Sequence, residues 1–237
     1  MTGSDESFSM VRWYASGDQV PIADRWIRHA AGFASNVDVA ICGPWTGPRN
    51  ALVQAQIFAD VADGAKVIVL DSVDNHTNIT KRAGVEHLPA AALEAFVDPA
   101  ELISQALVDH DVVVVDLSPT LIDGVSWPPV DSAVPLLRVL LDAQRVAVPG
   151  RLVIVLDEAT QIFDDDRLAR LAKMCLAEPT GQVSHVLVCD TQLSGIRSGE
   201  TIDLRIEAPS PSTYVGLAPT GEVFFLEVPQ ATSDDEI

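Results

Sequence analysis

The chain has 237 residues, 48% of them hydrophobic, which is enough for a folded α/β domain with a sizeable core and excludes disorder throughout. With 34 acidic and 15 basic residues its formal net charge is −19, so most of its surface should repel nucleic acid. The apolar runs are strand-length, far short of the roughly 20 residues that span a bilayer, and the polar, acidic residues 1–9 do not suggest a signal peptide.

The elements expected in the first half of the chain alternate between helix and strand. Apolar residues recur at helical spacing between short apolar runs, and Gly64 is a good helix terminator. After a loose lead-in over residues 1–20, the pattern predicts a helix over 21–33, a strand over 37–42, a helix over 50–63, a strand over 66–70, an irregular polar stretch over 71–82, and short helices over 90–96 and 99–108.

The second half continues this alternation and then changes character. It predicts a strand over 111–117, a loop over 118–130, a helix over 132–147, a strand over 152–156, a helix over 166–177, and a strand over 185–189. Short strand-like segments follow within 202–228, before an acidic tail over 232–237. We therefore expect one α/β domain over residues 1–237. Its sheet should be mostly parallel and flanked by helices, with a short antiparallel extension near the C-terminus.

The three cysteines, Cys42, Cys175 and Cys189, each lie among apolar neighbours. Their number is odd and their spacing is not that of metal ligands, so we expect buried, reduced thiols in a cytoplasmic protein. The five histidines show no ligand spacing either, and they predict no metal site.

The segment from Gly43 to Asn50 has the spacing of a phosphate-binding loop, G-x-x-x-x-G-K-[ST], but Pro48, Arg49 and Asn50 replace its last three residues. Pro48 has no N–H to donate, and the guanidinium of Arg49 is not interchangeable with a lysine ammonium. Asn50 offers a carbonyl oxygen where a magnesium-binding hydroxyl is usual, and it is also a good helix N-cap. A plain strand–turn–helix connection is therefore the alternative to a nucleotide site.

Asp157 and Glu158 directly follow the apolar strand expected over 152–156, which is the form of a Walker B motif. In such a motif the aspartate holds magnesium through water, and the glutamate polarises the attacking water. Because ligands bind at the carboxyl ends of parallel strands, both residues should share a rim of the sheet with Gly43. The alternative is an acidic strand end that an aspartate-rich chain produces by chance.

Other polar residues should reach the same rim. Thr191 and Gln192 follow the strand expected over 185–189, where they would either sense a γ-phosphate or form an ordinary polar loop. Asp71 and Asp116 also end strands there, and both could be simple strand-end caps.

The order of these motifs resembles the FtsK–HerA group of P-loop ATPases, especially TraG-like coupling proteins, conjugation ATPases and HerA-like proteins. The likeness runs from about residue 37 to 206, through segments 43–50, 66–71, 112–118 and 152–159 and the Thr191-Gln192 pair. It implies a RecA-like P-loop NTPase fold that binds ATP and magnesium. By position it implies Gly43, Thr46, Gly47, Arg49 and Asn50 at the nucleotide, Asp157 at the metal, Glu158 as catalytic base and Gln192 as sensor.

Members of that group are typically ring-forming motors that move DNA or protein. The resemblance thus implies a homo-oligomer, or a hetero-oligomer with a related ATPase, and contact with nucleic acid only through a local basic channel. Arg197 and Arg205 would then be arginine fingers that act on a neighbouring subunit, or else isolated surface arginines.

Three functions remain open from the sequence. The first is a divergent, inactive relative that acts as a regulatory or structural subunit in a DNA-transfer or mobile-element system. The second is an active ATPase that uses Arg49 in place of the lysine, which would explain why Asp157 and Glu158 are retained. The third is a binding module that takes no nucleotide, because fold does not dictate function.

Overall fold

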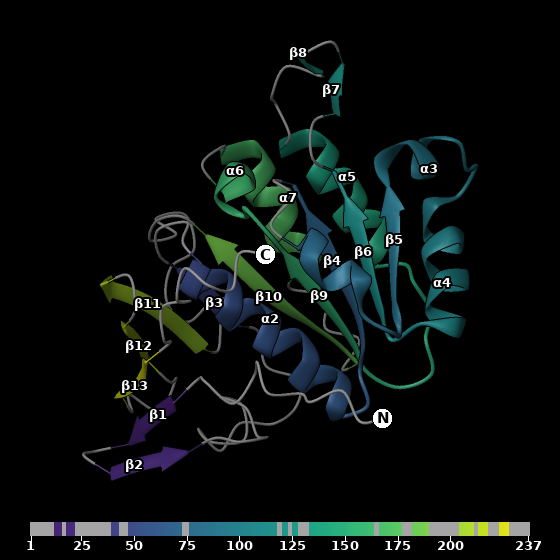
Figure 1. Ribbon diagram of the computed structural model, residues 1–237. Helices are drawn as coiled ribbons and strands as arrows, with labels where there is room; N and C mark the ends of the chain where they lie inside the picture. The colour runs from purple at the N-terminus through teal and green to yellow at the C-terminus, as the bar shows by residue number, and fades with distance from the viewer. Residues whose placement is uncertain are drawn as a thin grey trace.

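A single sheet of 11 strands organises the protein, in the order β2-β1-β13-β12-β11-β3-β10-β9-β4-β6-β5 (Figure 1). The computed structural model describes residues 12–15, 18–21, 39–42, 47–72, 76–117, 120–122, 125–127, 133–163, 166–176, 182–189, 204–210, 213–217 and 223–227. That the chain forms one domain over residues 1–237 stays a prediction, and the tail over 232–237 lies outside the described residues.

The larger part of the sheet is parallel. Every pairing from β11 through β3, β10, β9, β4 and β6 to β5 runs in the same direction, which confirms the predicted fold class. The central strands β6 and β9 contain uninterrupted apolar runs, VVVV and LVIVL, as expected where helices cover both faces of a sheet. Their bounds are Val39–Cys42 for β3, Lys66–Asp71 for β4, Val85–Pro89 for β5, Val112–Asp116 for β6, Leu152–Leu156 for β9, Val183–Cys189 for β10 and Leu204–Ser210 for β11.

The antiparallel part extends the sheet beyond β11. Strands β12 (Thr213–Leu217) and β13 (Val223–Glu227) form the extension expected near the C-terminus. Strands β1 (Arg12–Ala15) and β2 (Asp18–Pro21) then continue it, which differs from the loose lead-in expected over residues 1–20. Four residues carry little periodic signal, and the pairing of β1 depends on β13, which is distant in the sequence.

Helices cover the two faces of the parallel sheet (Figure 1). On one face, α2 packs Leu52, Val53 and Ile57 against alternate strand residues, together with Ile79 of the short 3₁₀ helix η2. The opposite face packs against helices that follow β5, β6 and β9. The bounds are Gly47–Ala62 for α2, Thr77–Lys81 for η2, Ala90–Glu94 for α3, Pro99–Asp109 for α4, Ala133–Ala143 for α5, Thr160–Phe163 for α6 and Asp166–Leu176 for α7.

Several elements differ from expectation. Helix α2 begins at Gly47 instead of residue 50, so its first turn includes the altered loop positions. Strand β5 was not expected, and the expected loop over 118–130 contains a hairpin of β7 (Thr120–Ile122) and β8 (Val125–Trp127). The hairpin stands clear of the sheet beyond the end of β6 (Figure 1). The helix expected over 21–33 lies outside the described residues, apart from Pro21 in β2.

None of the helices in the described segments combines the length and the apolar character needed to cross a bilayer.

Candidate functional site

Strand register brings the carboxyl ends of four central strands to one rim. Cys42 of β3 lies beside Cys189 of β10, and Leu156 of β9 lies between Leu70 of β4 and Leu187 of β10. Asp157, which follows Leu156, therefore lies at the same rim as Cys42, the last residue of β3. The shared rim that the sequence predicted for the ends of these strands is a direct result of this register.

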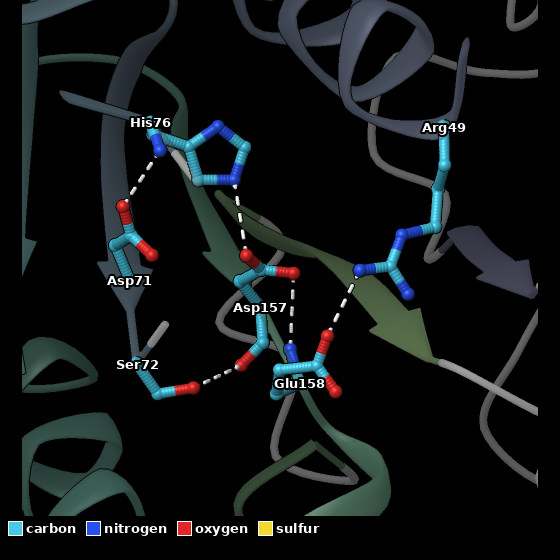
Figure 2. A network of polar contacts seen from close by, with 6 residues as sticks. All are labelled: Arg49, Asp71, Ser72, His76, Asp157 and Glu158. Carbon is cyan, nitrogen blue, oxygen red and sulfur yellow. Dashed lines mark hydrogen bonds and ion pairs between the residues drawn. The ribbon is translucent and has the colours of Figure 1, made fainter. Parts of the chain in front are cut away.

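Arg49 lies in the first turn of α2, and its side chain is completely buried, with 0% exposed. Its Nη2 atom donates a hydrogen bond to Oε1 of Glu158 over 2.9 Å (Figure 2). The Glu158 side chain is itself only 7% exposed. Arg49, predicted to replace the loop lysine, and Glu158, predicted as catalytic base, are therefore bound to each other in a buried ion pair.

The backbone at Glu158 is unusual. Its φ angle is 55°, and among the described residues it is the one non-glycine residue with positive φ. This conformation costs on the order of 1 kcal/mol and persists only where the surroundings hold it. Here the Glu158 N–H donates to Oδ1 of Asp157 over 3.0 Å, and the Ala159 N–H donates to the Val188 carbonyl over 2.8 Å.

Both carboxylate oxygens of Asp157 are engaged. Oδ1 accepts the Glu158 N–H, and Oδ2 lies 3.3 Å from Nε2 of His76 (Figure 2). The latter contact has the distance of an ion pair but not the angles of a good hydrogen bond. The backbone of Asp157 is also fixed, because its N–H donates to the Leu70 carbonyl and its carbonyl accepts from the Ser72 hydroxyl. The residue as a whole is 1% exposed.

His76 is the site residue that the sequence did not predict. It is buried, it precedes η2, and its backbone N–H donates to Oδ2 of Asp71 over 2.8 Å. Burial alone lowers the pKa of His76, but contact with Asp157 and the charges of Asp157 and Asp71 outweigh burial and raise that pKa above its ordinary value. The nearby Arg49 opposes this increase. The environment therefore favours the positively charged imidazole beside the two aspartates.

The described residues at this rim do not fit a magnesium ion. The Asp157 carboxylate contacts a histidine and a backbone N–H instead of presenting oxygens to a hydrated cation. Position 50, where the loop usually supplies a hydroxyl ligand, is an amide. Within the described part of the chain, no group of three or more His, Cys, Asp or Glu side chains is arranged to hold a metal ion.

The structure describes some of the remaining candidate residues but not others. Gly47 and Asn50 lie in the first turn of α2, beside Arg49. Asp116 is near His87 of the edge strand β5, with 3.4 Å between Oδ2 and Nε2. Gly43, Thr46, Thr191, Gln192 and Arg197 lie outside the described residues, as does the side chain of Arg205, and the roles assigned to them stay predictions.

Neither the protein-family models nor the curated protein sequences that we compared with this chain match it. Solved structures do. VirB4 of Thermoanaerobacter pseudethanolicus superposes with a TM-score of 0.62 at 10% identity, over 99% of this chain and 100% of that one. B204, the DNA-packaging ATPase from Sulfolobus turreted icosahedral virus, superposes with a TM-score of 0.53 at 13% identity, over 81% and 97%.

The chain has the α/β fold of these P-loop NTPase structures. The fold implied by the sequence resemblance is thus confirmed. A third P-loop ATPase structure is the genome-packaging NTPase B204 of Sulfolobus turreted icosahedral virus 2 in complex with AMPPCP, with a TM-score of 0.53 at 13% identity over 83% of this chain and 99% of that one. In that neighbour the P-loop ATPase fold accommodates a nucleotide analogue.

Proposed function

We propose that this protein is a P-loop ATPase-like subunit that does not hydrolyse ATP and acts as a regulatory or structural component of a DNA-transfer or mobile-element system. The observation that carries this proposal is the buried 2.9 Å ion pair between Arg49 and Glu158. Hydrolysis needs a cation on the phosphates and a carboxylate on the attacking water. Here each of those groups neutralises the other.

The state of Asp157 supports the same proposal. A hydrolytic site of this fold uses magnesium to neutralise charge on the transferred phosphoryl group. Because Asp157 contacts His76 and the Glu158 N–H, it offers poor support for that ion. Loss of the usual loop hydroxyl at Asn50 acts in the same direction.

The proposed setting rests on the neighbours and on charge. VirB4 and the DNA-packaging ATPase B204 share the fold of this chain at low identity. A non-hydrolysing protein of this fold would act through an active relative in a hetero-oligomer, or through copies of itself. With a net charge of −19, it would leave most DNA contacts to that partner, except along a local basic channel.

The proposal is tested by phosphate release from ATP in the presence of magnesium. We expect no turnover by the wild-type protein. The triple variant Pro48→Gly, Arg49→Lys, Asn50→Thr restores the usual loop residues, and we expect it to bind ATP more tightly than the wild type. Turnover by the wild type that Glu158→Gln abolishes would overturn the proposal in favour of an active ATPase. A folded triple variant that still ignores ATP would show that the loop has been misplaced.

A further inference from the structure

We infer that Glu158 is an internal competitor for Arg49, and that this site takes the triphosphate of a nucleotide without magnesium when a phosphate displaces the Glu158 carboxylate. The inference rests on the proposed function, because it assigns a ligand to a site that does not hydrolyse it. It goes further by naming the group that controls access and by excluding the usual metal.

Arg49 can bind a phosphate as well as a carboxylate. A guanidinium presents a planar set of N–H donors that bind carboxylate and phosphate oxygens in the same way. Its place in the first turn of α2 adds the partial positive charge of a helix N-terminus. The Glu158 oxygen at 2.9 Å from Nη2 is therefore in a position that suits a phosphate oxygen. Glutamate and phosphate compete for one cation.

Glu158 is the member of the ion pair that a phosphate would displace. Arg49 is 0% exposed, whereas the Glu158 side chain is 7% exposed and lies at the boundary of the buried region. Glu158 also has a strained backbone, with φ at 55°. A rearrangement of this turn would thus release strain, while Arg49 stays anchored in α2 (Figure 2).

The site as a whole has an excess of negative charge. The carboxylates of Asp71, Asp157 and Glu158 outnumber the basic groups of Arg49 and His76 in this network (Figure 2). A phosphate that enters beside all three carboxylates is repelled, so wild-type affinity should be weak. Neutralising Glu158 removes the competition and one of the three repelling charges, so ATP should bind more tightly.

Asp157 offers magnesium little support at this site. His76 Nε2 lies 3.3 Å from Asp157 Oδ2, and Oδ1 accepts the Glu158 N–H, so both carboxylate oxygens already have a neighbour. Magnesium gains no new carboxylate ligand unless His76 moves away. Magnesium should therefore add nothing to ATP affinity, and because it complexes ATP in solution, affinity should be no higher with magnesium than with a chelator.

The experiment is calorimetric titration of the full chain with ATP, once in EDTA and once in magnesium. We expect weak binding by the wild type that is no tighter in magnesium than in EDTA. In Glu158→Gln we expect about tenfold tighter binding in EDTA, again with no gain from magnesium. Adding Arg49→Met to that variant should abolish the gain.

The matched control is Asp60→Asn. Asp60 pairs with Arg151 over 3.2 Å, and this pair is also largely buried but lies at the far end of α2. The same acid-to-amide change there should leave ATP affinity at the wild-type value. If Glu158→Gln does not fold, Glu158→Asp withdraws the carboxylate from Arg49 and should change affinity in the same direction.

Different results would overturn the further inference and the proposed function. If the folded Glu158 variants bind ATP no more tightly than wild type, or only with magnesium, the inference is overturned. The proposed function then still stands, provided that the wild type releases no phosphate. Magnesium-dependent phosphate release by the wild type would instead overturn the proposed function.

Discussion

At the scale of single residues, the Arg49–Glu158 pair is better understood as a determinant of chemistry than as a source of stability. Removing two charges from water costs several kcal/mol per ion, and their mutual attraction offsets roughly that amount. Arg49 has lost all contact with solvent, and Glu158 nearly all. What the pair provides is a defined arrangement in which a new anion can bind Arg49 only by displacing Glu158.

This balance predicts how stability responds to substitution. Arg49→Met leaves the Glu158 carboxylate buried without its cation, and we expect a loss of about 3–5 kcal/mol in the free energy of unfolding, measured with urea. Arg49→Met combined with Glu158→Gln removes both charges and should recover most of that loss. A double variant as unstable as the sum of the two single variants would contradict this account.

The sequence predicted part of this network, for a physical reason. Asp157 and Glu158 end a strand, and parallel strands bring such ends together, so their shared rim with Arg49 followed from topology. The direct pairing did not, because Arg49 and Glu158 are 109 residues apart and no local pattern encodes their contact. His76 was missed for the same reason, since it contacts Asp157 only in the folded chain.

At the scale of elements, α4 shows how local sequence fixes a boundary. Asp98 precedes the helix, its side chain accepts the Ala100 N–H over 3.1 Å, and Pro99 occupies the first helical turn, where a missing N–H has no cost. The predicted start at residue 99 is confirmed. Edge strand β5, in contrast, was missed because its sequence, VEHLP, mixes polar residues and a proline with its apolar ones.

The cap predicts a modest, local effect. Asp98→Ala removes an acceptor for an orphan N–H, and we expect the free energy of unfolding to fall by about 1 kcal/mol in urea denaturation. Asp109→Ala is the control at the opposite end of α4, where an acid opposes the helix dipole. That control should be neutral or slightly stabilising, and an equal loss in both variants would argue against a capping role.

At the scale of the whole molecule, the parallel sheet separates two apolar layers. Alternate residues of each central strand face α2 on one side and α4, α5 and α7 on the other. Cys42 and Cys189 belong to the second layer, and both are buried, as predicted. Burial, together with contact with Cys42, raises the pKa of the Cys189 thiol well above its ordinary value. The side chain of Cys175 lies outside the described residues.

The layering predicts thiol protection. In a Cys175→Ser variant, neither remaining thiol should react with an aromatic disulfide reagent in native buffer, because the thiolate is both disfavoured and covered. Both should react in denaturant. Two equivalents of rapid reaction at neutral pH without denaturant would show that this layer is open to solvent.

The pairing of β1 with β13 has a consequence for biosynthesis. Trp13 lies opposite Leu226, so an N-terminal strand finds its place in the sheet only after β13 has been made. During translation, β1 and β2 leave the ribosome long before β13, the strand against which β1 docks. Strands β3 to β10 lie between them in the sequence, so all of these are synthesised before β13. Contacts between such distant segments form slowly, and exposed strand edges are prone to wrong pairings. Strand β1 is therefore synthesised well before the strand that protects its edge.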